Sequence, residues 1–145
     1  MIPPLDPDTG YLPPGIHAAV WTDVWARFSS TPYRASLTLG LRQGLEQLRD
    51  AGCRTALLDG SYISAKEIPG DYDVAYEPFG MDPDRLDPVF FEFGNLRAAM
   101  KIKFGGEFFP AHFYAAPGIL YRDWFLKDKD GVAKGIIQID PVSVP

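Results

Sequence analysis

The sequence is short of cysteine, histidine and long apolar runs, and each shortage excludes a class of protein. A single cysteine, Cys53, cannot form an internal disulfide, so we expect a reducing, cytoplasmic location. The two histidines, His17 and His112, are too far apart in sequence for a spacing-based metal motif. No stretch approaches the roughly 20 apolar residues that cross a bilayer, and no secretory signal is visible at the N-terminus. We therefore expect no membrane partner.

Basic residues are also fewer than acidic ones. The chain has 14 Lys and Arg against 19 Asp and Glu, a net charge of −5 at pH 7. Broad electrostatic binding to nucleic acid needs an excess of basic side chains on one face, so it is not expected. A nucleotide is not excluded, because it arrives with a divalent metal ion and carboxylates bind such ions.

The composition is that of one globular domain. The chain has 145 residues, of which 46% are hydrophobic and 14% aromatic, enough to bury a core. Its first 15 residues hold five prolines and two glycines, which disfavour helix. Residues 1–17 are expected to form a Pro-rich arm, either a mobile tail or a strap packed across the domain. Leu5, Tyr11, Leu12 and Ile16 favour the strap, and residues 18–145 are expected to form a single domain.

Hydrophobic spacing switches between helical and strand periods along the chain. It predicts an α/β (α+β) fold, a small mixed sheet flanked by helices. The predicted helices cover residues 18–28, 33–51 and 88–103, and the predicted strands cover residues 55–58, 72–76, 108–114 and 135–139. Thr31 and Pro32 are typical of a helix N-cap and first turn. Pro110 indicates that the third strand lies at a sheet edge or carries a bulge.

One segment, residues 57–73, combines residue types that suit phosphate and metal. Gly60 ends a strand and allows another group to approach the backbone closely. Ser61 follows where a helix is expected to start, so its hydroxyl and nearby N–H groups can point at a phosphate. Asp71 and Asp73 are two apart on a strand, so both side chains emerge on one face, roughly 7 Å apart. Two such carboxylates suit Mg²⁺, and bound metal ions can activate a hydroxyl and stabilise leaving pyrophosphate.

These residues resemble the signature of the polymerase-β-like nucleotidyltransferase superfamily. That signature is a hydrophobic strand, Gly-Ser or Gly-Gly, a spacer, and then Asp-hydrophobic-Asp-hydrophobic. The resemblance covers residues 57–76, and the order of the surrounding elements is similar to that of minimal members. Three features depart from the pattern. Asp59 stands where an apolar residue is usual, Gly70 stands where Ser is common, and no second domain that would grip the base or acceptor is seen.

A closer resemblance extends over residues 59–74, 12–17 and 134–136. Those stretches are similar to a group of small bacterial and phage proteins that are assigned to this fold and have no established activity. Some minimal members of the superfamily are antitoxins that adenylylate a partner toxin, and others are toxins that modify transfer RNA. The resemblance therefore also implies a place in a toxin–antitoxin or phage-related system.

The resemblance implies a metal-dependent transfer of a nucleotidyl group from a nucleoside triphosphate to a hydroxyl on protein, RNA or a small molecule. It implies Mg²⁺ or Mn²⁺ as cofactor and a third carboxylate on a later strand, for which Glu107 is the candidate. The implied catalytic and metal-binding residues are Asp71, Asp73 and Glu107, and the implied nucleotide-binding residues are Gly60, Ser61 and Lys66.

Each of these features also has an ordinary structural explanation. Gly60-Ser61 alone is typical of a turn with a helix-capping serine, and Asp71 and Asp73 alone are typical of a solvated strand end. Lys66 is equally well explained as an exposed lysine. The aromatic residues outnumber what one small core needs, which favours a protein interface. The alternative is therefore a catalytically inactive interaction protein of the same fold, an antitoxin or a phage-encoded modulator.

Overall fold

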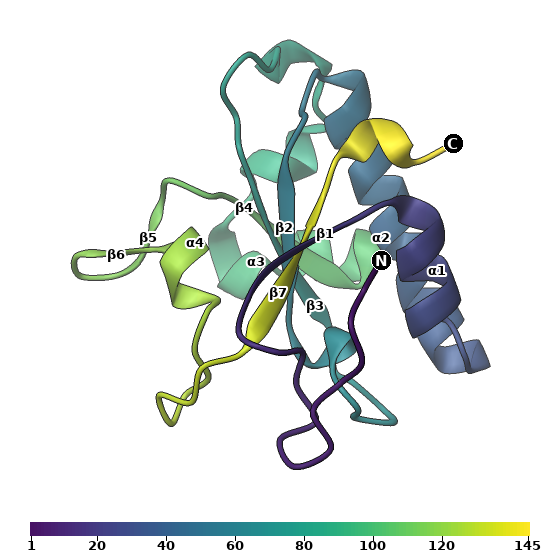
Figure 1. Ribbon diagram of the computed structural model, residues 1–145. Helices are drawn as coiled ribbons and strands as arrows, with labels where there is room; N and C mark the ends of the chain where they lie inside the picture. Colours follow the sequence, from purple (N-terminus) through teal and green to yellow (C-terminus); the bar gives the residue numbers. More distant parts are fainter.

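A five-stranded mixed sheet is the frame of the molecule (Figure 1). The computed structural model describes all 145 residues. The strand order is β1-β7-β2-β3-β4. Their bounds are Gly15–Ala19 for β1, Ala56–Asp59 for β2, Tyr72–Tyr76 for β3, Gly106–Pro110 for β4 and Gly135–Ile139 for β7. β1 runs parallel to β7 and β3 parallel to β4, whereas β2 is antiparallel to both of its neighbours.

Helices lie on both sides of this sheet. Figure 1 shows α1 and α2 on one side and α4 with the small β5-β6 sheet on the other. The α-helices are α1 Trp21–Phe28, α2 Pro32–Asp50, α3 Gly94–Phe104 and α4 Tyr121–Trp124, and the small sheet pairs β5 Tyr114–Ala116 with β6 Ile119–Leu120. Short 3₁₀ helices are η1 Ser61–Ile63, η2 Pro83–Arg85, η3 Pro88–Phe91 and η4 Pro141–Ser143. The predicted α+β fold with a mixed sheet is confirmed.

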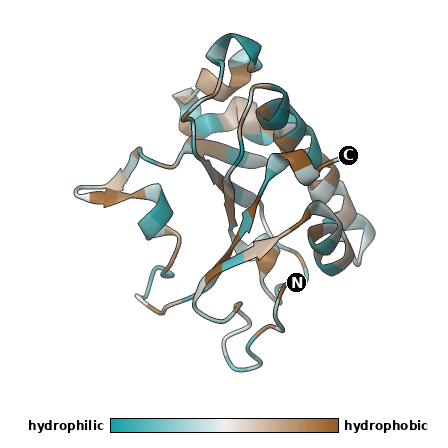
Figure 2. Cartoon of the chain, turned by 45° about the horizontal axis from the view of Figure 1, so that its top comes forward, coloured by the Kyte–Doolittle hydropathy of each residue, from teal (hydrophilic) through white to brown (hydrophobic).

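The two faces of the sheet bury two separate apolar clusters, because successive side chains of a strand point to opposite faces. The larger cluster has 27 buried residues and includes side chains of α1, α2 and α3, whereas the smaller has six and includes Phe125 beside α4. The sheet contributes Leu58, Val74, Phe108 and Ile137 to the larger cluster and Leu57, Ala75, Phe109 and Ile136 to the smaller one. Figure 2 shows hydrophobic residues along the strands. We call the face with the smaller cluster the second face.

The long helix α2 forms as its sequence predicts. The Thr31 hydroxyl accepts a hydrogen bond from the N–H of Arg34 at 3.1 Å, and Pro32 occupies the first turn. Two glycines of α2 allow close packing on its buried side. A Cβ on Gly40 would lie 1.7 Å from the Phe104 carbonyl oxygen, and one on Gly44 would lie 2.1 Å from the Phe108 ring. α2 therefore sits directly against α3 and β4.

Two predicted helices are wrong in part. Residues 15–19, at the end of the predicted arm and the start of the first predicted helix, form β1 instead. The predicted helix over 88–103 is divided into η3 and α3, and its middle is left-handed: Asn95, Leu96 and Arg97 have φ of 52°, 54° and 60°. Such backbone is rare outside glycine, so no helical spacing could indicate it.

The third predicted strand is shorter than residues 108–114. β4 ends at Pro110, and the chain turns before β5 begins at Tyr114. The prediction that Pro110 lies at a sheet edge is confirmed, because β4 is the last strand of the sheet. Proline has no N–H to donate to a further strand, so the position tolerates it.

The N-terminal segment lies against the domain. Ile2 and Leu12 are only 3% and 2% exposed, and the Arg27 guanidinium donates to the carbonyl oxygens of Ile2 and Pro3 at 2.7 and 2.8 Å. The Tyr11 hydroxyl donates to the Asp128 carboxylate at 2.8 Å. This segment is therefore packed across the domain, and we call residues 1–14 the strap.

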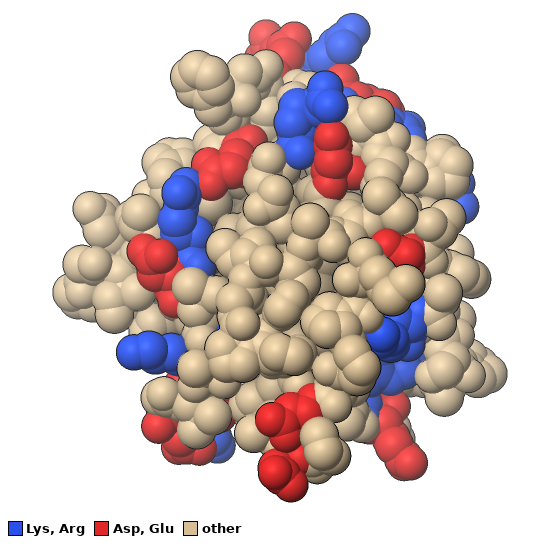
Figure 3. Space-filling model, in the orientation of Figure 1, with Lys and Arg blue, Asp and Glu red and all other residues tan.

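Charged side chains of both signs are interspersed on the face of the molecule shown in Figure 3, around a largely uncharged centre. No helix combines the length and the apolar character that crossing a bilayer would require.

Candidate active site

A row of three carboxylates crosses the second face of the sheet. Asp59 ends β2 and lies opposite Asp73 of β3, and Asp73 lies beside Glu107 of β4. Residues paired across neighbouring strands point to the same face, so the three carboxylates are adjacent. Asp71 is two residues before Asp73 and lies on the same side. Like charges on opposed residues destabilise a sheet, so this row indicates a function and not a contribution to stability.

The two outer carboxylates of the row are neutralised by basic side chains. An Asp59 oxygen lies 2.7 Å from Nζ of Lys134, in a pair that is almost fully buried. The Glu107 oxygens lie 2.8 Å from Nζ of Lys101 and 3.2 Å from Nε of Arg97. The ends of the row therefore carry no net negative charge.

The central carboxylate of the row, that of Asp73, and the neighbouring Asp71 carboxylate form no ion pair and no side-chain hydrogen bond with the rest of the protein. Burial raises the pKa of Asp73 to about 7, and the charges of Asp71, Glu107 and Asp59 act in the same direction. The pKa of Asp71 is also raised, first by burial and then by Glu107, while Lys101 opposes the rise. The pair is thus a partly buried acidic site with no cation of its own.

This donor set fits a metal ion that arrives with a substrate better than a resident one. No group of three or more His, Cys, Asp or Glu side chains is arranged to hold a metal ion. Glu107 is on the correct face, but its oxygens are occupied by Lys101 and Arg97. Asp71 and Asp73 remain, and Mg²⁺ is commonly held by one or two carboxylates together with waters and substrate phosphates.

Gly60 brings the bend after β2 against the start of β3. Its φ is +104°, and a Cβ at this position would lie 3.1 Å from Cα of Tyr72 and 3.2 Å from the carbonyl oxygen of Asp71. A side chain here would be strained both by the backbone conformation and by this contact. Glycine therefore allows the bend to lie directly beside the two free carboxylates.

Ser61 begins η1, so a helix does start at this residue, but it is a single 3₁₀ turn of three residues. Its hydroxyl forms no hydrogen bond within the protein, and Ser64 donates from its own hydroxyl to the Ser61 carbonyl oxygen at 2.6 Å. The buried guanidinium of Arg34 donates to the carbonyl oxygens of Tyr62, Ser64 and Lys66, the first at 2.7 Å. The bend is thereby fixed while the Ser61 hydroxyl stays free.

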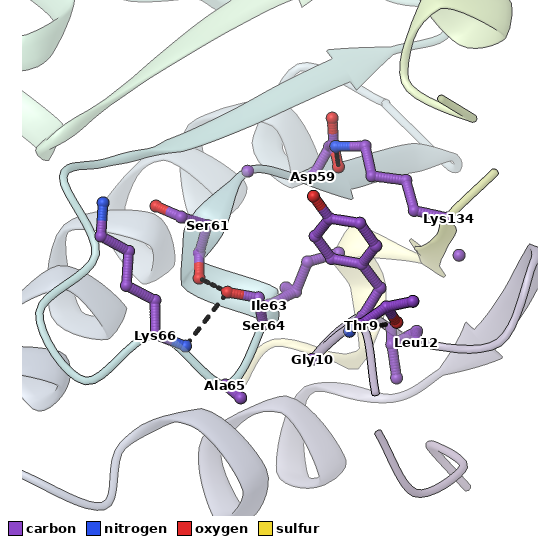
Figure 4. Close-up of a pocket in the computed structure, with 13 residues that line it drawn as sticks. Thr9, Gly10, Leu12, Asp59, Ser61, Ile63, Ser64, Ala65, Lys66 and Lys134 are labelled. Carbon is purple, nitrogen blue, oxygen red and sulfur yellow. Dashed lines mark hydrogen bonds and ion pairs between the residues drawn. The ribbon is translucent and has the colours of Figure 1, made fainter. Parts of the chain in front are cut away.

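Two cavities open on either side of Gly60. The smaller, of about 380 Å³, is lined by Ser61 and Lys66 together with strap residues (Figure 4). The larger, of about 770 Å³, is lined by Asp73 and by the segment around α4. Gly60 lines both, whereas Asp71 and Glu107 line neither. Gly60 therefore shares the larger cavity with Asp73 and the smaller cavity with Ser61 and Lys66.

Three residues at the site were not predicted from the sequence. Asp59 departs from the nucleotidyltransferase-like motif, although its place directly before Gly60 is a usable signal. Lys134 lies 75 positions from its partner Asp59, so only the fold brings them together. Arg97 is placed by the left-handed turn, with its guanidinium carbon 4.6 Å from the centre of the Phe109 ring. Strained backbone of this kind costs about 1–3 kcal/mol per residue and clusters at functional sites.

Fold and site together define an α+β domain with an acidic site on one face of its sheet. Over residues 3–140 the chain matches a family of unknown function, DUF6932, and it belongs to that family. No significant match was found among curated proteins. No solved structure matches significantly either.

Proposed function

We propose that this protein is a metal-dependent nucleotidyltransferase. The observation that supports this function best is the pair Asp71 and Asp73, which lacks a cation partner although both neighbouring carboxylates have one. A nucleoside triphosphate with Mg²⁺ or Mn²⁺ would supply that missing positive charge. The glycine bend lies beside the pair, and Gly60 and Ser61 both line the smaller cavity. The backbone at the bend and the free Ser61 hydroxyl can therefore donate hydrogen bonds to a phosphate group.

Each residue has a role in this proposal. Asp71 and Asp73 would hold the cation, whose charge would offset that of the phosphates and lower the pKa of the acceptor hydroxyl. The Ser61 hydroxyl donates a hydrogen bond to a phosphate oxygen, and Lys66, which also lines the smaller cavity, adds positive charge. Glu107 holds Arg97 and Lys101 close to the site. It becomes a third metal ligand only if those two side chains move to the phosphates.

The reaction in this proposal joins an acceptor hydroxyl to the nucleotide. The hydroxyl oxygen forms a bond to the α-phosphorus, the bond from that phosphorus to the bridging oxygen breaks, and pyrophosphate leaves. The hydroxyl proton passes to solvent. A protein, an RNA end or a small molecule can each supply the hydroxyl. A cytoplasmic location and a toxin–antitoxin or phage-related role belong to the same proposal.

The test is transfer of label from α-labelled nucleoside triphosphates, with Mg²⁺ or Mn²⁺, to the protein itself, to transfer RNA and to small hydroxyl compounds. We expect transfer and pyrophosphate release with the wild-type protein. Asp73→Asn and Asp71→Asn should reduce the rate at least about a hundredfold, which corresponds to about 3 kcal/mol of transition-state stabilisation. Asp84→Asn, an exposed acid on η2, is the matched control and should not change it. Absence of both transfer and nucleotide binding would count against the proposal.

One observation favours the alternative, an inactive interaction protein of the same fold. Glu107 is already neutralised by two basic side chains, as in a site that has kept its shape without turnover. This alternative predicts that Asp71→Ala and Asp73→Ala leave the biological activity intact. Loss of that activity, with folding unchanged, would exclude it.

A further inference from the structure

The two cavities that meet at Gly60 differ in chemical character. Both are lined by Gly60, Asp59 and Lys134. The smaller adds the hydroxyl-bearing Ser61 and Ser64 together with strap residues, whereas the larger adds Trp124 together with apolar and charged side chains from β6, α4 and the segment after it. A ligand that crosses the junction therefore has serine hydroxyls available on one side and the Trp124 indole on the other.

The aromatic surface is provided by Trp124, which lines the larger cavity and is 50% exposed. Its position is fixed because α4 is anchored to the sheet by its neighbours. The Tyr121 ring stacks on Phe109 with centroids 4.2 Å apart and an interplanar angle of 6°, and Phe125 is 3% exposed. The anchored helix α4 thus presents a half-exposed indole to a cavity that Asp73 also lines.

Basic groups in the same cavity are free to meet phosphate. Lys127 and Lys129 line it and form no ion pair within the protein, whereas Lys134 at the junction is paired with Asp59. The Asp128 carboxylate is occupied by the Tyr11 hydroxyl and by backbone N–H groups. At about 770 Å³ the cavity is within the roughly 300–1,000 Å³ that small-molecule sites occupy.

We propose that the larger cavity is a nucleobase-binding subsite, in which a base stacks on Trp124 while its phosphates lie toward Asp73 and Gly60. This inference rests on the proposed function, because it identifies where the nucleotide substrate is held. It gives this domain a means of binding the base through its own residues. Stacking is sequence-tolerant, because every base has an aromatic face.

Tryptophan fluorescence tests the subsite without relying on catalysis. The full-length protein is titrated, without metal, with adenosine, guanosine, cytidine and uridine in turn, while calorimetry follows the same additions. At least one nucleoside should quench the fluorescence. Trp124→Leu should remove the quenching and weaken binding about tenfold or more, in line with the contribution of a base–aromatic stack. Trp25→Phe is the matched control, because Trp25 is 42% exposed on α1 and lines neither cavity.

The outcomes separate this inference from the proposed function. Quenching that depends on Trp124 but occurs in a protein without transferase activity supports the subsite and counts against the enzyme. Suppose instead that a nucleoside triphosphate binds with Mg²⁺ and that this binding depends on Asp73. If the binding is unchanged in Trp124→Leu and causes no quenching, the subsite is refuted and the proposed enzyme activity is not. Failure of all four nucleosides to quench likewise overturns the subsite.

Discussion

Replacing Asp73 by asparagine should make the protein more stable at pH 8. Asparagine keeps the shape of the side chain but removes the negative charge of Asp73, which is partly buried and has no ion-pair partner. The pKa of Asp73 rises from 3.8 to about 7 on folding, and each unit corresponds to about 1.4 kcal/mol, so ionisation costs at most about 4 kcal/mol. With solvent and counter-ion screening we expect a gain of about 2–4 kcal/mol in the free energy of unfolding.

The sign of the pH dependence follows from the same values. Between pH 4 and pH 7 the folded state holds a proton on Asp73 that the unfolded state has lost, so the wild-type free energy of unfolding falls as pH rises. Above about pH 7 this contribution is constant. Urea unfolding at pH 5 and pH 8 should therefore show a larger advantage for Asp73→Asn at pH 8, with Asp84→Asn unchanged from the wild type. An Asp73→Asn protein that is less stable than the wild type at pH 8 would refute the reasoning.

Three further predictions concern the groups around the carboxylate pair. Gly60→Ala should lower the free energy of unfolding by about 1–3 kcal/mol in urea titrations, because it adds a strained φ and a close contact. Lys134→Met should cost about 3–5 kcal/mol, because it leaves Asp59 buried and unpaired, and Asp59→Asn in the same chain should recover much of that loss. Arg34→Met should cost about 2–4 kcal/mol and speed amide hydrogen exchange over residues 61–66, because three carbonyl groups lose their donor.

Each of these has a control within the chain. Gly15 has a φ of +116° but no atom within 4 Å of an added Cβ, so Gly15→Ala measures the backbone strain alone. Equal losses in Gly15→Ala and Gly60→Ala would show that the contact with β3 does not matter. An Asp59→Asn/Lys134→Met protein as unstable as Lys134→Met would contradict the buried ion pair. Exchange rates unchanged by Arg34→Met would mean that the bend does not need Arg34.

Local chemistry was enough to predict the central elements of the fold. β3 and β7 have the bounds that the sequence predicts, β3 from its alternating pattern, and the apolar stripe and capping residues of α2 define that helix. The glycine bend at Gly60, Asp73 on β3 and Asp71 directly before that strand were likewise accessible from local sequence. These features depend on residues a few positions apart, where periodicity and turn preferences carry the information.

The remaining features depend on contacts between distant residues. β1 is a short edge strand whose partner, β7, is more than a hundred positions away in sequence. The placement of Glu107 beside Asp73 requires the parallel register of β3 and β4, and its neutralisation requires the left-handed turn that positions Arg97. Neither the pairing register of two strands nor a left-handed turn of non-glycine residues produces a periodic pattern in the sequence. The charge balance of the site therefore emerges only from the fold.

The binding of a nucleotide with its metal tests the central claim most directly. Thermal unfolding is measured with ATP, GTP, CTP and UTP, each with and without Mg²⁺, because a ligand that binds only the folded state raises stability by about 2.7 kcal/mol at a hundred times its dissociation constant. We predict a metal-dependent rise in melting temperature for the wild-type protein and none for Asp71→Asn or Asp73→Asn. No rise in the wild type, or an equal rise in both variants, would contradict the account.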